Sequence, residues 1–444
     1  MVSLTRPVRQ GLATLVLALV SVVPTAYVGL TAWRINRPGH VRDVEVELGR
    51  RLGMHVSLRE VGYPRPGEVR GRGLVLRREE PRGGRLAELA RAESVELEWV
   101  DRELTIRLDE PALRADSPAE ALAQTAALLA QLGRLSYEHV SFSSATCRLD
   151  LGTGDGAAVV RDLAGECVIE RESATLRVAL AAPGSGTTAH CEAILTRDRR
   201  TEPITTTLNV KTIEGPPLPA SALSAFFDAP EWLGPRATVM GELELKKAGA
   251  GGLEARFSGS LLDVDLGTLV GKRFPGQHLS GRARLKVASA RWGDRGAQGP
   301  GWIEIKGELT AESGSIGVGL IEALGREMRF RPSPRLKGQI ARRTDLDFRA
   351  LGFAFTVTAL GEIQLHGALG PDFAPDVVLA GATAPLLSAP EGAASVHRLI
   401  KTLFPVSASD SALLVPLTAL SRPLLALPVA PAPESGRATS VDGN

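Results

Sequence analysis

The chain opens with a long apolar stretch. Gly11 to Trp33 holds no charged residue, and a helix of that length rises about 34 Å, enough to span a bilayer core of roughly 30 Å. Arginines flank it on both sides. A cleaved signal peptide is the alternative, but its apolar run would be about 7–15 residues long. The pattern predicts an uncleaved anchor over residues 1–34 with the rest of the chain outside; its apolar positions include Gly11, Leu15, Leu17, Leu19, Val22, Tyr27 and Trp33.

After the anchor, helical spacing gives way to strict alternation. Val41, Val44, Leu48 and Leu52 recur at helical intervals before Gly53, which predicts a short helix. Apolar residues then alternate with polar ones over residues 94–99 and again over 104–108, on either side of the polar pair at 101–102. This spacing predicts a half-buried hairpin.

Further alternating segments follow, and four helical segments are expected among and after them. Short strands are expected near 147–151, 167–169, 176–180, 191–195, 208–210, 241–246, 281–287, 301–309, 335–346, 351–358 and 361–366. An amphipathic helix over 116–136 is predicted by Ser117 as cap, Glu120 in a capping box and Gly133 as stop. Shorter helical pieces are expected near 266–270 and 319–324, and a helix over 388–403.

The fold class that follows is mainly β, a long curved antiparallel-rich sheet with a few short helices and one N-terminal transmembrane helix. A closed, filled barrel or sandwich fits the same periodicity. The predicted regions are residues 1–34 (anchor), 35–115 (helix and hairpins), 116–136 (helix), 137–215 (middle β region), 216–405 (C-terminal β region, beginning at a proline cluster), 406–427 (apolar segment) and 428–444 (disordered tail).

Composition narrows the class of protein. The chain has 444 residues, a formal net charge of +2 and an apolar fraction of 44%, which is typical of folded domains and not of a disordered chain. Acidic residues offset the basic ones, 50 against 52, so no nucleic-acid partner is expected.

No constellation of catalytic or metal-binding residues stands out. The seven histidines are dispersed. Asp263 and Asp265 share a strand and favour a solvated face over an acid–base pair, and residues 184–188 lack the ending of a phosphate loop. The sequence therefore predicts a protein that is not an enzyme and has no cofactor and no metal.

Three cysteines fall in predicted strands, in phase with apolar neighbours. Cys147, Cys167 and Cys191 are expected to be buried free thiols. One disulfide between neighbouring strands in an oxidising compartment is the alternative, with the pair undetermined.

Several stretches resemble the AsmA-like family of bacterial envelope proteins. They are the anchor followed by residues 44–76, with Pro64-Arg-Pro-Gly and Gly71-Arg-Gly-Leu; residues 253–266 with 281–285; and residues 314–324 with 335–367. The resemblance implies an inner-membrane, single-pass protein whose body lies in the periplasm. It also implies a U-shaped sheet that carries the acyl chains of membrane lipids in an apolar groove, in support of outer-membrane assembly.

Period-two patterning marks candidate groove positions, and a sheet with one aliphatic and one charged face would shield acyl chains from water. An outer-membrane or envelope protein is expected as a further partner at the C-terminal end. A non-enzymatic envelope scaffold with a closed β core is the alternative. The groove candidates are Leu243, Leu245, Leu285, Val287, Ile303, Ile305, Ile363 and Leu365.

Overall fold

The structure is a computed structural model. It describes residues 6–404 except 66, 80–85, 116–123, 126–136, 151–157, 183–188, 214, 221–228, 250, 275, 296–298, 335, 337, 339–342 and 383. The predicted helix over 116–136 lies outside the described residues apart from Gln124 and Thr125, which are helical. The regions 406–427 and 428–444 and the segment 184–188 also lie outside them.

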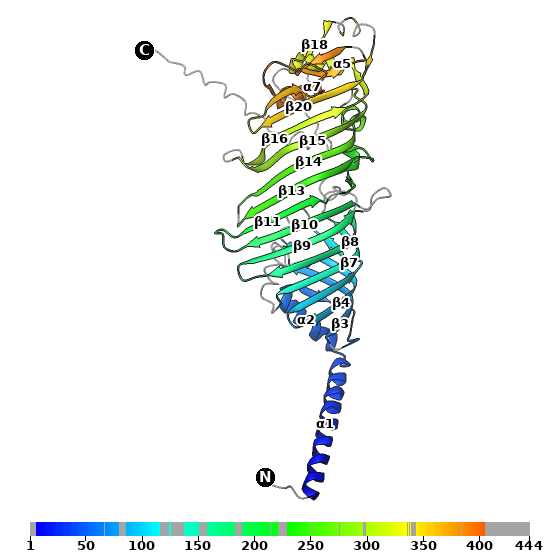
Figure 1. Cartoon of the computed structure of the whole chain (residues 1–444), viewed down its shortest axis with the longest axis vertical. Coiled ribbons are helices and arrows are strands. Elements are labelled where there is room, and N and C mark those ends of the chain that lie inside the picture. Colours follow the sequence, from blue (N-terminus) through cyan, green and yellow to red (C-terminus); the bar gives the residue numbers. More distant parts are fainter. Residues whose placement is uncertain are drawn as a thin grey trace, which may run out of the picture.

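Two helices begin the chain. Helix α1 (Arg6–Ile35) extends away from the rest of the molecule (Figure 1), and α2 (His40–Leu52) follows it. Gly53 ends α2 with a φ of 64°, and its N–H donates to the Gly49 carbonyl, as expected of a glycine in the left-handed C-cap conformation. The predicted helix after the anchor is therefore confirmed. When only the described side chains are counted, no helix has the length and hydropathy needed to cross a membrane.

Strands make up most of the remaining chain. The bounds of the strands from β1 to β12 are β1 His55–Ser57, β2 Glu60–Gly62, β3 Glu68–Glu79, β4 Leu86–Val100, β5 Glu103–Asp109, β6 Ala112–Arg114, β7 His139–Asp150, β8 Ala158–Ile169, β9 Ser173–Ala182, β10 Ala189–Asp198, β11 Thr205–Thr212 and β12 Leu218–Pro219. Those of the later strands are β13 Thr238–Ala248, β14 Leu253–Asp265, β15 Arg282–Asp294, β16 Pro300–Ala311, β17 Gly314–Gly317, β18 Arg331–Pro332, β19 Asp345–Phe348, β20 Ala350–Thr358, β21 Glu362–Gly367, β22 Val377–Ala380, β23 Pro385–Ser388 and β24 Ala394–Ser395.

All described strands except β17 and β19, which pair with each other in a separate sheet, form one long ladder in nearly sequential order. From β3 the pairing runs through β4, β5, β7, β8, β9, β10, β11, β13, β14, β15 and β16 to β20 and β21. Every described pairing is antiparallel except those of β5 and β6 with β7. Figure 1 shows the ladder as a long, twisted sheet. No described pairing joins its two ends, so the sheet is open and not a closed barrel.

The predicted hairpin is present as strands β4 and β5. Val100 lies opposite Glu103, and Asp101 in the turn has a φ of 53°, a conformation that Asp tolerates better than most residues. The sheet also continues across the predicted boundary at residue 216, because β11 pairs with β13 from Thr205–Ala248 to Lys211–Glu242.

Helices gather at the C-terminal end of the ladder. They are α4 (Ala229–Leu233), the π-helical turn η2 (Gly267–Gly271), α5 (Val318–Met328) and α7 (Val396–Leu403). Leu320, Ile321, Val396 and Ile400 share one buried cluster with residues of β14–β16, β20 and β21. This is the largest core among the described residues.

Two predicted elements differ from the structure. A strand over 335–346 is wrong for most of its length: Pro334, Leu336 and Gly338 are helical, and strand β19 starts at Asp345. Ser333 starts the helical turn, since its Oγ accepts from the Leu336 N–H at 3.3 Å, and Leu336 is fully buried.

The helix expected over 388–403 forms only in its second half. Gly392 has a φ of 96°, which breaks a helix. The helix instead begins after Ser395, whose side chain accepts a hydrogen bond from the Arg398 N–H.

Candidate functional site

One row of apolar residues crosses the whole ladder. Starting from Val69 in β3, each member lies directly opposite the next on the neighbouring strand. Thirteen such steps, at about 4.8 Å each, extend about 60 Å. The row, called the apolar row below, consists of Val69, Leu97, Ile106, Phe142, Gly165, Val178, Ala193, Val210, Leu243, Phe257, Ala290, Ile305, Val357 and Ile363.

Neighbouring rows on the same face are apolar as well. Cys167 lies opposite both Val140 and Leu176, and Leu208 lies opposite Leu195 and Leu245. The face that carries these rows is called the apolar face below.

Burial along the apolar row changes from one end of the sheet to the other. From Leu97 in β4 to Phe257 in β14 every member is only partly buried. From β15 onward Ala290, Val357 and Ile363 are buried at 6%, 7% and 3% exposure, and Ile305 is partly buried. Val357 and Ile363 belong to the core to which the C-terminal helices contribute. Along this row the middle strands thus present an aliphatic strip that the described residues cover incompletely. Val69 at the start of the row (9%) and members of the neighbouring rows, such as Val140 (2%) and Leu195 (3%), are buried.

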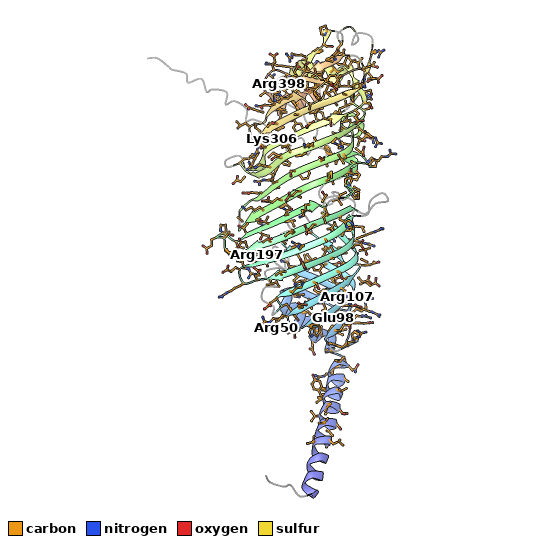
Figure 2. All side chains as sticks on the ribbon, viewed as in Figure 1. Arg50, Glu98, Arg107, Arg197, Lys306 and Arg398 are labelled. Carbon is orange, nitrogen blue, oxygen red and sulfur yellow. The ribbon has the colours of Figure 1, made fainter. Side chains whose placement is uncertain are left out.

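The opposite face of the sheet is charged. Arg70 in β3 pairs with Glu96 in β4, and Arg107 in β5 approaches Glu96 and Glu98 within 4 Å. Further along, Glu192 pairs with Arg177 at 3.3 Å and with Lys211 at 2.9 Å. Charged side chains project from the sheet over its length, from Arg107 to Lys306 (Figure 2). These exposed pairs contribute little stability each, but they keep this face in water.

Seven of the eight predicted groove residues lie on the apolar face. Leu243, Ile305 and Ile363 belong to the apolar row. Leu245 lies two residues along β13 from Leu243. Leu285, Val287 and Leu365 lie opposite Leu261, Gly259 and Phe355 of the same face.

Ile303 is the exception. A bulge between Trp302 and Glu304 shifts the register of β16 against β15. The Ile303 Cδ1 lies 3.3 Å from the position that a Cβ on Gly293 would occupy, next to Glu254 Cγ. Ile303 therefore lies on the charged face, since the bulge reverses the alternation expected from the sequence.

The predicted groove residues differ in what covers them. Ile363 and Leu365, 3% and 8% exposed, belong to the C-terminal core, and Leu285 and Ile305 pack against that core. The less covered part of the face consists of residues for which the sequence offered no individual prediction, such as Ile106, Phe142, Val178 and Val210. Their alternation with polar neighbours was the available signal.

Four of the predicted anchor residues are described in α1, and all four are exposed. Leu17 and Tyr27 are each 71% exposed, and Val22 and Trp33 are exposed too. The Arg37 guanidinium lies 4.5 Å from the centre of the Trp33 ring. The side chains of Gly11, Leu15 and Leu19 lie outside the described residues.

The three cysteines are buried and free, as predicted. The register explains why they do not pair: Cys147 lies opposite Val160, seven residues from Cys167 on the same strand, and β9 separates Cys167 from Cys191. Burial raises the pKa of each thiol to about 11; at Cys191 the Glu192 carboxylate adds to this. The thiols therefore stay protonated and unreactive at neutral pH.

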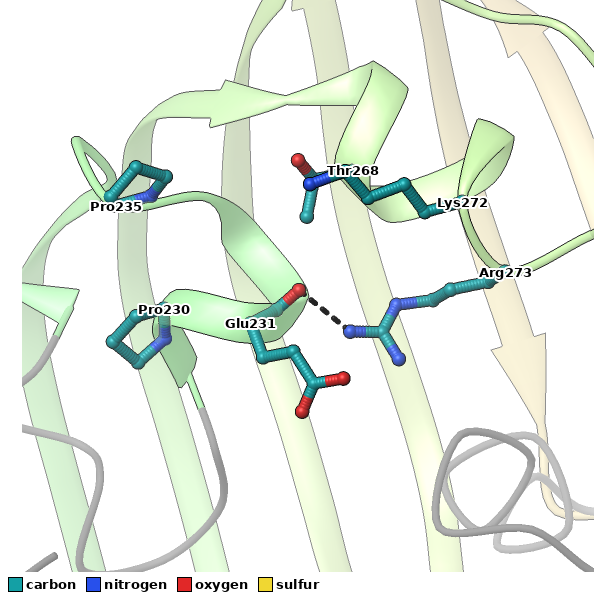
Figure 3. Close-up of a pocket in the computed structure, with 6 residues that line it drawn as sticks. All are labelled: Pro230, Glu231, Pro235, Thr268, Lys272 and Arg273. Carbon is teal, nitrogen blue, oxygen red and sulfur yellow. Dashed lines mark hydrogen bonds between the residues drawn. The ribbon is translucent and has the colours of Figure 1, made fainter.

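A small cavity lies beside α4 and η2. It has a volume of about 140 Å³ and is lined by Pro230, Glu231, Pro235, Thr268, Lys272 and Arg273. Arg273 is buried; its Nη2 donates to the Glu231 carbonyl oxygen at 2.7 Å (Figure 3), and its guanidinium stacks 3.5 Å above the Trp232 ring. Arg273 thus braces η2 against α4.

A larger cavity lies at the other end of the sheet, between α2 and strand β1. Its volume is about 620 Å³, and its wall includes Arg42, Glu45, Val46, Met54, His55 and Arg78. It is called the α2 cavity below.

The other groups weighed for chemistry form no site. Among the described residues, no three histidines, cysteines or carboxylates are grouped to hold a metal. Asp265 caps η2, accepting from the Gly267 and Thr268 N–H groups, and Asp263 pairs with Arg282 at 3.8 Å.

Comparison with known proteins gives no relative: no family model, no curated protein and no solved structure matches the chain.

Proposed function

We propose that this protein is anchored in the inner membrane by α1 and binds or conducts lipid acyl chains along the apolar face, in the manner of the AsmA-like proteins that its sequence resembles. The observation that carries the proposal is the apolar row, continuous across the ladder and only partly buried from β4 to β14. An aliphatic surface of this length is unfavourable in water at about 25 cal/mol per Å², and acyl chains would cover it.

The proposal includes a division between the two faces of the sheet. The charged face would stay in the aqueous periplasm, whereas the apolar face would form a groove that is least covered along the apolar row from β4 to β14 and is filled by the C-terminal core beyond it. Among the described side chains of α1, nine large apolar ones are exposed, which suits a helix surrounded by lipid better than one in water.

The test uses the full chain reconstituted in vesicles of phosphatidylethanolamine and phosphatidylglycerol that contain a lipid with a photoactivatable group in its acyl chain. After illumination, mass spectrometry should locate covalent adducts on strands β4–β14. A Phe142→Asp, Val178→Asp variant places two carboxylates on the apolar face and should lose these adducts about tenfold or more, since burying an acyl chain against an ion is costly.

A Ser143→Asp, Thr175→Asp variant is the matched control, because each position lies on the charged face of the same two strands. It should retain the adducts. Equal labelling of both variants, or no labelling of the sheet in the wild-type protein, would contradict the proposal.

The second candidate is a non-enzymatic envelope scaffold with a filled core. The C-terminal core favours it, because Ile363, Leu365 and Leu379 are buried there by protein alone. A wild-type protein that takes up no photoactivatable lipid while remaining folded would support this candidate.

A further inference from the structure

The α2 cavity combines basic and apolar walls. Arg42 on α2 and Arg78 on β3 line it together with His55, and Val46, Met54 and Val56 supply apolar surface. Val46 is 64% exposed, unusual for a valine on a short helix packed against a sheet. Such a wall suits a ligand that has an anionic group and an apolar part.

The charge in this cavity is unbalanced. Glu45 is the carboxylate among its lining residues, and its Oε1 already accepts the Leu58 N–H at 2.7 Å. Arg42 and Arg78 form no ion pair with any described side chain. By contrast, Arg50 on the same helix is paired with Glu47 at 2.7 Å. Two guanidinium groups that face a concavity and pair with no described carboxylate are suitable donors for a phosphate.

The cavity also adjoins both the anchor and the apolar face. Helix α2 starts five residues after the end of α1. On the other side lies Leu58, which is buried and whose N–H donates to Glu45. The Leu58 Cδ2 and the Val95 Cγ1 each lie 3.0 Å from the position that a Cβ on Gly71 would occupy, so the two side chains are close together. Val95 lies two residues along β4 from Leu97 of the apolar row.

We propose that the α2 cavity binds the phosphate of a phospholipid headgroup through Arg42 and Arg78, and that lipid passes there from the membrane onto the apolar face. This inference rests on the proposed function, since it supplies the entry site for the same acyl chains. The volume of the α2 cavity accommodates a phosphate together with the glycerol backbone of the lipid. Val46, Met54 and Val56 would contact the start of the acyl chains.

The experiment measures binding of dihexanoyl-phosphatidylglycerol, below its micelle concentration, to the full chain held in amphipol, by isothermal titration calorimetry. Inorganic phosphate is titrated in parallel. The test variant is Arg42→Gln, Arg78→Gln. The matched control is Arg50→Gln, Arg77→Gln, which removes the same number of charges from the same helix and strand outside the cavity wall.

The expected result is saturable binding of the short-chain lipid, weakened about tenfold or more in the test variant and within about twofold of wild type in the control. Inorganic phosphate should bind more weakly than the lipid. Equal affinity for the two ligands would overturn the assignment to a lipid, and equal losses in both variants would overturn the site.

The acyl-chain labelling described above separates this inference from the proposed function. If the test variant binds the short-chain lipid normally while the strands are still labelled, the entry site is wrong and the apolar face remains a lipid surface. If the strands are not labelled in the wild type, the proposed function fails irrespective of the titration, and the entry route fails with it.

Discussion

The ring of Phe142 in β7 lies across Gly165 in β8, directly opposite it in the register. A Cβ on Gly165 would overlap the ring atoms Cζ, Cε1 and Cε2. Gly165 is therefore the place where the apolar row admits an aromatic side chain lying flat on the sheet. We expect Gly165→Ala to displace the ring and lower the free energy of unfolding by about 1–3 kcal/mol, the usual cost of overpacking, in chemical denaturation.

Gly252→Ala is the control for this prediction. Gly252 precedes β14, and a Cβ there would meet nothing within 4 Å, so its stability should change by no more than about 0.5 kcal/mol. Equal stability of the two variants would show that packing of the Phe142 ring does not require a glycine at position 165.

The contact between Glu45 and Leu58 gives a second prediction. It joins α2 to the residue that follows β1 by a charge-assisted hydrogen bond. Glu45→Ala should leave the Leu58 N–H without this partner and cost about 1–3 kcal/mol. Amide hydrogen exchange at Leu58 should accelerate accordingly.

Glu47→Ala removes a carboxylate of the same helix whose pair with Arg50 is exposed, so a change under about 1 kcal/mol is expected. If both substitutions accelerated exchange at Leu58 equally, the effect would come from the helix as a whole.

Stability should fall at alkaline pH because of the thiols. Burial raises the pKa of Cys147, Cys167 and Cys191 from 9.0 to about 11. Between these values the unfolded chain loses the proton and the folded chain keeps it, so the free energy of unfolding decreases as pH rises, by about 1.4 kcal/mol per thiol and pH unit. Below pH 9 this contribution is fully present.

Denaturation midpoints measured from pH 8 to pH 10.5 test this prediction. A variant with all three cysteines replaced by alanine should show a shallower decline over the same range. Identical slopes in the two proteins would mean that the thiols titrate alike in the folded and unfolded states.

Arg273 gives a fourth prediction. Its guanidinium both stacks on Trp232 and donates to the Glu231 carbonyl, a combination that a lysine ammonium does not reproduce. Arg273→Lys should therefore cost about 1–2 kcal/mol and change Trp232 fluorescence. The control is Lys272→Ala at the neighbouring exposed residue, which should leave both the free energy of unfolding and the Trp232 fluorescence unaltered. If this control lost as much stability as Arg273→Lys, the role of Arg273 in bracing η2 against α4 would be contradicted.

Much of the strand pattern could be predicted because one period-two signal repeats along the chain. The turn at Asp101, the end of α2 at Gly53 and the burial of the three cysteines all depend on local sequence, and all three predictions are confirmed. The open ladder could not be separated from a closed barrel in this way, because closure depends on whether the first and last strands meet.

The failures also have a physical cause. Ile303 and Ile305 look equivalent in the sequence, but the bulge beside Trp302 is set by pairing with β15, and this turns Ile303 to the other face. Likewise, nothing local distinguishes Leu243 from Ile363. Ile363 is buried because α5 and α7 pack against its part of the sheet, whereas Leu243 lies outside that core and stays partly uncovered.

The near-sequential order of the ladder has a consequence for how the chain is made. Because each strand mostly pairs with the one synthesised just before it, contacts are short-range and loop closure is rapid. Strands β1 and β2 both pair with β3, so the first edge is covered before the rest of the sheet exists. Two steps have to wait for a longer connection to emerge: the parallel step onto β7 and the step from β16 to β20, which β17, α5, β18 and β19 separate in sequence. Apart from these two steps, the exposed, aggregation-prone edge during biosynthesis is the newest strand of the ladder.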